Sequence, residues 1–570
     1  MPLRCFAFRF ALVISCLMTV PTMSLADTVS DIIKQLSPSA LTPTEMRSEL
    51  IWFQHTGQIF DGKSITVISE DIPTHRWERD TLAKHFKALT GISVHFDIIG
   101  EAGVVESMFK QLSSGKHLYD IYVNDADHIG THTRLQGVVD LTQYMQNKGK
   151  TFTNPYLDLD DFLNLKFGQD YRGHQLQLPD QQFANLYWYR HDWFTRPDIQ
   201  KKFRQFTISK YGKENAYSLG VPINWAAYED IAEFFTETKI DGEKVYGHTD
   251  FGKNSPSLGW RFTDAWLSIA GAGDKGLPNG SPVDEWGIRT VNNIPRGSSM
   301  ARGGATNSPA AVYALESYID WMQRFSPPSA KEGTFLASDV SAAQGNVAQQ
   351  IFLYTLWINQ PAFHRGRMLD NQGKTVWRLA PTPHGRYWDK GMKVGYQDAG
   401  SWTIPKSTQG GKRAAAWLWA QFCVSKSAAL AKFKAGGTPV RHSTLATNFV
   451  QKNKSKWGGL IEFYQSNAIN HWTDTGLNVP HYPLMFRAWW PNLNKAIKGE
   501  ISAKNAMDNI AEQQDLIMGQ LQLNKYTPKL NPLKSEEYWL NKAGAPKPWR
   551  EREQPRTRLL SEVIDIWGEL

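Results

Sequence analysis

Carboxylate side chains recur where short apolar runs of this chain end. Glu70, Glu101 and Asp125 each follow a run rich in valine and isoleucine, and Asp127 lies two residues beyond Asp125. If these runs are parallel strands, their carboxyl ends meet at one edge of a sheet, where functional groups gather. Carboxylates at such an edge suit a ligand rich in hydroxyl groups, whereas the alternative role of the same residues is to cap helix N-termini.

A βαβαβ unit is the element that would bring these residues together. The expected strands are 64–69, 92–99 and 119–124, and the helical stretches 74–90 and 104–114 connect them. Strands and helices that alternate at this spacing predict a parallel sheet.

Four further elements are expected outside this unit. Residues 27–62 form a helical lead in which Pro43 falls in the first turn of a helix. An apolar helix is expected at 346–357, a strand at 377–383 and an amphipathic helix at 411–433.

Other motifs with catalytic or metal-binding potential are weaker. His128 and His132 have the spacing of two ligands on one helical face, but we find no third ligand and expect both to lie on the surface. Residues 271–276 match Gly-x-Gly-x-x-Gly, but they follow a helical pattern instead of the strand that a nucleotide site requires. Asp125 and Asp127 do not establish the flanking carboxylates of a glycosidase. We therefore expect no catalytic residue, no metal and no cofactor.

The first 26 residues have the pattern of a cleaved secretory signal. Arg4 and Arg9 precede the apolar stretch 10–20, and residues 24–26 form a small-x-small cleavage site. Two alternatives stay open, an uncleaved N-terminal anchor and lipidation at Cys16.

Composition further limits the class of protein to which this chain can belong. The chain has 570 residues, 41% of them hydrophobic, which is enough to build substantial cores. Its net charge of +8 is dispersed, so we expect no nucleic-acid partner.

After signal cleavage only Cys423 of the three cysteines would remain. The core must then hold an exported chain together without a disulfide, which suits a bacterial periplasm. The 22 tryptophans suit the apolar faces of sugars and polyols, although any single one is as well explained by core packing.

Longer segments carry a resemblance to a known family. The chain resembles the extracellular solute-binding proteins of carbohydrate ABC importers, and is most similar to the rhizobial-type glycerol-binding subgroup. The resemblance extends from about residue 49 to about residue 546. The segments that carry it are 69–70, 119–127, 177–188, 228–230, 257–268, 343–350, 395–403 and 458–464.

This resemblance implies an α/β, two-lobed periplasmic-binding-protein fold with a hinge and an interlobe ligand cleft. After the signal 1–26 and the lead 27–62, we expect the first lobe at 63–180 with 395–445. The second lobe would comprise 181–394 with 446–570. The hinge would close on the ligand, and the closed form would dock on the permease.

Within the cleft, we expect a set of ligand-binding residues, because each buried hydroxyl of a ligand needs a hydrogen-bond partner. The expected acceptors are Glu70, Asp125, Asp127, Asp180 and Asp398, the donors are Arg261 and Asn185, and the aromatic platforms are Trp188, Trp260 and Trp402. Asp264 would orient Arg261 as a helical neighbour. Core packing is the alternative for Trp188 and Trp260.

The expected function is that of a non-enzymatic, periplasmic, monomeric substrate-binding protein. It would capture glycerol or a related small polyol or sugar and deliver it to the permease subunits of an ABC importer in the inner membrane. Two other classes stay open, an exported glycan-active hydrolase and a solute-binding protein that serves a chemoreceptor.

Overall fold

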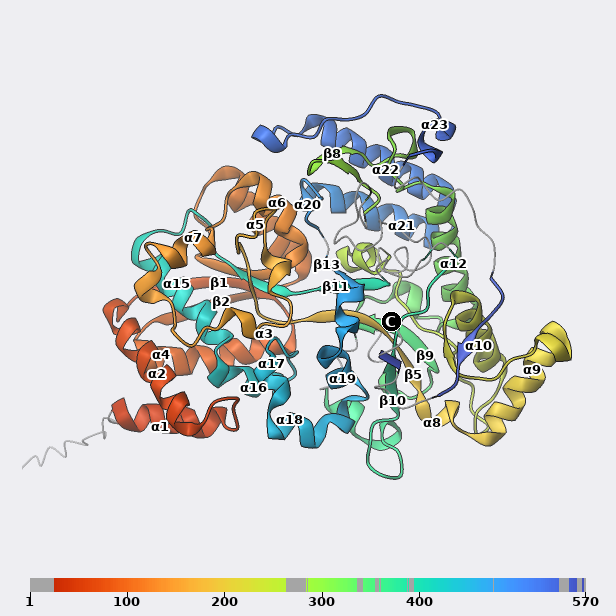
Figure 1. Cartoon of the computed structure of the whole chain (residues 1–570), viewed down its shortest axis with the longest axis horizontal. Helices are drawn as coiled ribbons and strands as arrows, with labels where there is room; N and C mark the ends of the chain where they lie inside the picture. Colours follow the sequence, from red (N-terminus) through yellow and green to blue (C-terminus); the bar gives the residue numbers. More distant parts are fainter. Residues whose placement is uncertain are drawn as a thin grey trace, which may run out of the picture.

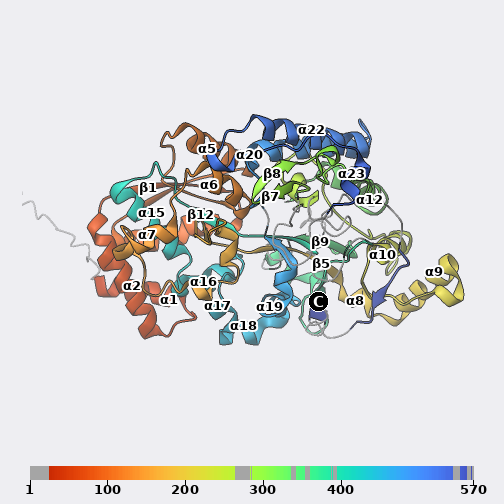
Figure 2. The same ribbon diagram turned by 45° about the horizontal axis from the view of Figure 1, so that its top comes forward.

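Two β-sheets organise the chain, each at the centre of its own α/β body, and the bodies lie side by side in both views (Figure 1, Figure 2). The computed structural model describes residues 25–262, 283, 286–335, 342–353, 358, 360–386, 388, 394–474, 476–542, 553–560 and 566–567. The signal pattern up to residue 24, the 271–276 motif and Asp264 lie outside these residues. Within the described ranges, no helix is both long enough and apolar enough to cross a membrane.

The first sheet contains the predicted parallel unit. In spatial order its strands are β2 (Ser93–Ile99), β1 (Ser64–Glu70), β3 (Ile121–Asp125), β12 (Gly400–Thr403) and β4 (Leu178–Pro179). β1 pairs in parallel with both β2 and β3, and β12 returns antiparallel to β3. The βαβαβ prediction is therefore confirmed, and a strand from far along the chain completes the sheet.

The helices of this unit end where glycine permits a left-handed turn. Their order is α3 (Pro73–Trp77), a π-helical turn at 78–82, α4 (Ala83–Thr90) and, after β2, α5 (Glu101–Ser114). Gly91 and Gly115 follow α4 and α5 with φ of 73° and 67°, which glycine adopts without the steric cost of a Cβ.

The N-terminal lead packs onto the first body. It forms α1 (Leu25–Leu36) and α2 (Pro43–Gly57), and Thr42 and Glu45 make a reciprocal capping box at the start of α2. Val29 and Phe53 are buried in the same core as strand β1. The predicted helical lead is thus confirmed as a layer of this body.

Two sequence predictions are wrong. The expected helix 411–433 is two helices, α15 (Gly410–Cys423) and α16 (Lys426–Lys434), because the Ser425 side chain accepts the Ala428 N–H and starts a new helix. The expected helix at 346–357 contains strand β9 (Gln349–Leu353). β9 pairs antiparallel with a central strand of the second sheet, so long-range pairing outweighs the local helical pattern.

The second sheet is built around one long buried strand, β5. Its strands run in the order β10 (Trp377–Ala380), β5 (Phe183–Arg190), β11 (Gly395–Asp398) and β13 (Trp472–Asp474), and β9 also pairs with β5. The helices of this body include α10 (Trp225–Glu237), α12 (Pro309–Phe325), α21 (Trp489–Ile497) and α22 (Ala503–Gln520).

Short segments carry the chain between the two sheets. It passes from β4 to β5 through residues 180–182, and from β11 back to β12 through Ala399 alone. The two passages are tied together, because the Gly400 carbonyl accepts the N–H groups of Asp180 and Gln181 at 2.7 and 3.1 Å. Such short, hydrogen-bonded passages between two bodies have the form of a hinge.

A buried charge cluster braces this crossing. The Lys432 ammonium on α16 lies 2.5 Å from Asp180 Oδ1 and 3.0 Å from Glu78 Oε1, and all three side chains are at most 1% exposed. Burial opposes the charge of Lys432, but the two carboxylates outweigh it and raise its pKa. Trp402 donates its indole N–H to the same Asp180 oxygen at 2.6 Å.

Removing this ammonium should destabilise the whole fold. Lys432→Met would leave Glu78 and Asp180 buried without a counter-ion, so we expect a loss of about 3–5 kcal/mol in the free energy of unfolding, measured in urea. The matched control is Lys434→Met, since Lys434 is exposed on the same helix. Equal losses in the two variants would contradict a bracing role for the cluster.

Candidate functional site

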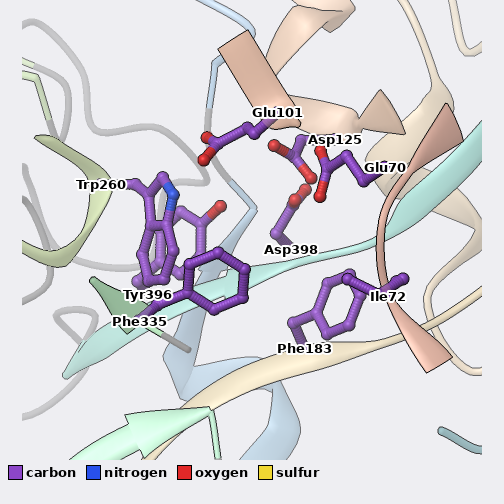
Figure 3. A pocket seen from close by; sticks show the side chains of 9 residues that line it. All are labelled: Glu70, Ile72, Glu101, Asp125, Phe183, Trp260, Phe335, Tyr396 and Asp398. Carbon is purple, nitrogen blue, oxygen red and sulfur yellow. The ribbon is translucent and has the colours of Figure 1, made fainter. Parts of the chain in front are cut away.

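A pocket lies at the ends of the strands, where the two bodies meet (Figure 3). About 440 Å³ of space, part of it open to solvent, lies between the lining side chains. The lining residues are Glu70, Ile72, Glu101, Asp125, Phe183, Trp260, Phe335, Tyr396 and Asp398. Carboxylates form one wall and aromatic rings face them across the pocket (Figure 3).

Strand topology gathers the carboxylates. Glu70 and Asp125 end the parallel strands β1 and β3, and Glu101 follows β2 at the first residue of α5. Asp398 comes from the second sheet, at the end of β11. The register of β12 against β3 pairs Gly400 with Asp125, and the Ala126 N–H donates to Asp398 Oδ1 at 2.9 Å. The four acids are therefore held at one point by backbone pairing.

Burial makes these acids hard to ionise. Burial, and then the charge of Asp398, raise the pKa of Glu70 to about 7. Burial raises the pKa of Asp398 to about 6, a rise limited by the backbone N–H groups of Ala399 and Ala126. The pKa values of Glu101 and Asp125 are also raised well above the ordinary range, first by burial and then by neighbouring carboxylates.

The aromatic wall is ordered by its own contacts. The Trp260 and Tyr396 rings stack with centroids 5.8 Å apart and an 18° interplanar angle, and Phe335 meets Trp260 edge-on at 6.1 Å. A hydrogen bond between the Trp260 and Glu101 side chains lowers the pKa of Glu101 and so opposes the rise from burial. The Tyr396 hydroxyl donates to Asp127 Oδ2 at 3.2 Å. The two walls are thus linked by hydrogen bonds.

The pocket brings together four of the residues expected from sequence, Glu70, Asp125, Trp260 and Asp398. Asp127 lies directly behind it, fully buried and bonded to the lining residue Tyr396.

The other five expected residues do not line this pocket. Asp180 and Trp402 belong to the Lys432 cluster. Arg261 is 2% exposed and forms a two-pronged pair with Asp250, at 3.1 Å from Nε and 2.6 Å from Nη2, instead of reaching the pocket.

Trp188 and Asn185 lie inside the second body. Trp188 is fully buried against Trp377 and Phe363, with ring centroids 5.1 and 6.0 Å away, which is the core-packing alternative. Asn185 is also fully buried on β5. Its backbone carbonyl accepts the Trp472 indole N–H at 2.8 Å, whereas its side-chain amide has no hydrogen-bond partner among the described residues.

Sequence reasoning did not select five of the lining residues as ligand contacts. Glu101 was recognised as a strand-end carboxylate but not carried forward. Tyr396 precedes Asp398 by two residues, so the two-residue repeat of a strand places it on the same face. Ile72 follows Glu70 by two residues but has no polar group to mark it as a contact. Phe183 and Phe335 have no local signal, because the packing of distant segments brings them to the pocket.

The prediction of surface histidines is wrong. His128 and His132 are 0% and 1% exposed. His128 packs on the Tyr482 ring at 4.6 Å, and burial lowers the pKa of His132 to about 3. Tyr482, which covers the His128 ring, lies more than 300 residues later in the chain, so no local pattern could indicate this contact.

Comparison with known proteins identifies the fold. No protein-family model and no curated protein matches the chain. Among solved structures, the ABC transporter solute-binding protein of Agrobacterium radiobacter, in complex with ribitol, is 19% identical with a TM-score of 0.60. That of Agrobacterium vitis, with bound D-mannitol, is 15% identical with a TM-score of 0.58. Maltose-bound T. maritima MalE3 is 16% identical with a TM-score of 0.56.

Each alignment covers 80% of this chain and 99–100% of the other. The likeness confirms the two-lobed α/β fold of solute-binding proteins.

The raised pKa values predict how the stability of the protein depends on pH. A carboxyl whose pKa is raised on folding adds stability below its ordinary pKa, and that stability is lost as the pH rises through the folded value. For Asp398 this stability is lost between the ordinary pKa of 3.8 and the folded-state pKa of about 6. Asp398→Asn should therefore gain stability relative to the unmodified protein between about pH 4 and about pH 7, by a few degrees in Tm.

The comparison is between two proteins at each pH, because buried histidines with lowered pKa values, such as His75, titrate in the same range with the opposite sign. A Tm difference that stays constant with pH would contradict the assigned burial of Asp398.

Proposed function

We propose that this chain is the solute-binding component of an ABC importer, and that it captures a small polyol or sugar in the pocket between its lobes. The observation that carries the proposal is the pocket itself, in which carboxyl groups from β1, β3 and β11 face the stacked rings of Trp260 and Tyr396. Ribitol, mannitol and maltose in the similar structures support the same ligand class.

The pocket chemistry suits hydroxyl groups bonded on one side and C–H groups packed on the other. A carboxylate accepts hydrogen bonds and a protonated carboxyl also donates one, so the four acids can satisfy hydroxyls in either direction. The faces of Trp260 and Tyr396 can cover the apolar side of a polyol. Glycerol is the first ligand to test, as the sequence resemblance suggests.

Lobe closure would complete the site. Glu70 and Asp125 belong to the first sheet, and Tyr396 and Asp398 to the second, so a ligand that touches both sets holds the lobes together. The lobes already meet beside the pocket, where the buried Arg134 of α6 (Ile129–Leu135) donates to the Leu477 carbonyl at 2.8 Å. Rotation about residues 180–182 and 399 would open this contact and the pocket together.

Export and delivery complete the proposal. The chain would act in the periplasm after signal cleavage, as a monomer without catalytic activity, and the closed form would dock on the permease in the inner membrane.

Ligand binding should raise the thermal stability of the purified protein. A ligand at about 100 times its Kd adds about 2.7 kcal/mol to the folded state, a shift of a few degrees in Tm. We expect a shift with glycerol or with another member of a panel of polyols and sugars. A folded sample that shows no shift with any of them would contradict the proposed function.

Asp125→Ala tests the pocket directly. The substitution removes a carboxylate from the pocket wall, so we expect binding to be lost while the protein stays folded, measured by titration calorimetry and by Tm without ligand. The control is Asp97→Ala on strand β2 of the same sheet, since Asp97 is exposed and outside the pocket. Unchanged affinity in Asp125→Ala would remove Asp125 from the site.

A further inference from the structure

We propose that the solute carries a cationic amino group beside its hydroxyl groups, so that the site selects an amino alcohol or amino sugar over the corresponding neutral polyol. This inference rests on the proposed function and narrows its ligand class. It follows from four features of the pocket: acids that lack a basic partner among the described residues, two acid oxygens without a donor there, the aromatic wall and the spacing of the acids.

No basic side chain among the described residues forms an ion pair with the four pocket acids, so any charge that they carry has no counter-ion there. The charges that act most strongly on Glu70, Glu101 and Asp125 are those of other carboxylates. The buried cations of this region are already paired, Arg261 with Asp250 and Lys432 with Glu78 and Asp180. Like charges at one site cannot all ionise unless a positive charge joins them, and a cationic ligand would supply it.

Two acid oxygens lack a hydrogen-bond donor from the described residues. Asp398 is 2% exposed, and its Oδ2 atom is buried without a partner there, as is Glu70 Oε1. Both side chains point toward the same space as Asp125 (Figure 3). An ammonium group has three donors and no acceptor, so it can satisfy both of these oxygens, and its charge favours the ionised carboxylates, which only accept.

The aromatic wall also favours a cation. An ammonium over the face of Trp or Tyr is attracted by the negative ring face, most strongly where water is excluded. Trp260 and Tyr396 are 6% and 4% exposed, and they lie across the pocket from the carboxylates (Figure 3). A cation between the two walls would be favoured by both.

A metal ion fits this pocket less well than an organic cation. Calcium and magnesium require several oxygen ligands around one point, and aromatic rings provide none. Among the described residues, only His75, Glu78 and Asp180 bring three ligand atoms within 4.8 Å of one another, and the Lys432 ammonium binds two of these three. The pocket acids are spaced more widely, as suits a larger cation.

Matched ligand pairs test this inference. We would titrate the purified protein with glycerol and 3-amino-1,2-propanediol, and with glucitol and 1-amino-1-deoxyglucitol, in a calorimeter at about pH 6 and about pH 8. At least one amine should bind about tenfold or more tightly than its neutral partner at the higher pH, because charge-assisted hydrogen bonds exceed neutral ones. Its affinity should rise from the lower to the higher pH, with protons released on binding.

The outcomes separate the two proposals. Neutral polyols that bind as tightly as their amines would overturn the amine preference and leave the proposed function standing. Calcium chloride that titrates to one equivalent in the absence of any amine would assign the acids to a metal instead. No binding by these compounds, nor by any member of the panel of polyols and sugars, would contradict both proposals.

Neutralising one acid provides the internal control. Asp398→Asn keeps the shape of the side chain but removes its charge, so it should reduce the preference for the amine over the neutral partner about tenfold. Asp97→Asn, outside the pocket, should keep the preference. If Asp398→Asn does not fold, Glu70→Gln makes the same test, and an unchanged preference in the folded variant would overturn the inference.

Discussion

Assembling acidic side chains at one buried point is the constraint on which the rest of this structure depends. Side chains that repel one another stay together only if the backbone leaves them no alternative. Here three of the acids follow strands of one sheet, and the pairing of β12 with β3 carries Asp398 to the same place. The raised pKa values of Glu70 and Asp398 show that this arrangement opposes ionisation, and perturbed pKa values are typical of functional sites.

The hinge and the pocket are parts of one arrangement. Ala399 joins Asp398 of the pocket to β12 of the first sheet, so the passage between the lobes adjoins a ligand-facing side chain. Its partner passage begins at Asp180, which Lys432 and Trp402 hold. His75 extends the link, since its ring bonds to the Glu70 carbonyl at 2.9 Å and lies 3.2 Å from the Gln181 amide. A change at the carboxylates can therefore reach both crossing segments within a few contacts.

The sequence predicts what depends on local pattern and not what depends on distant partners. The parallel unit and the strand-end positions of Glu70 and Asp125 follow from apolar periodicity and glycine stops. The burial of His128, the strand at 349–353 and the partner of Asp180 all involve segments far away in the chain, which a single sequence does not display. Both Asp180 and Asp398 are expected from the sequence to bind the ligand. In the structure Lys432 forms an ion pair with Asp180, which has a structural role, whereas Asp398 lines the pocket.

A crystal structure of the protein grown with its tightest-binding polyol or amino polyol would test the central claim most directly. The account predicts a ligand between the lobes, with a donor group on the Asp398 carboxylate and its carbon chain against the Trp260 ring. A ligand bound on the outer face of either lobe, with Asp398 and Trp260 untouched, would contradict it.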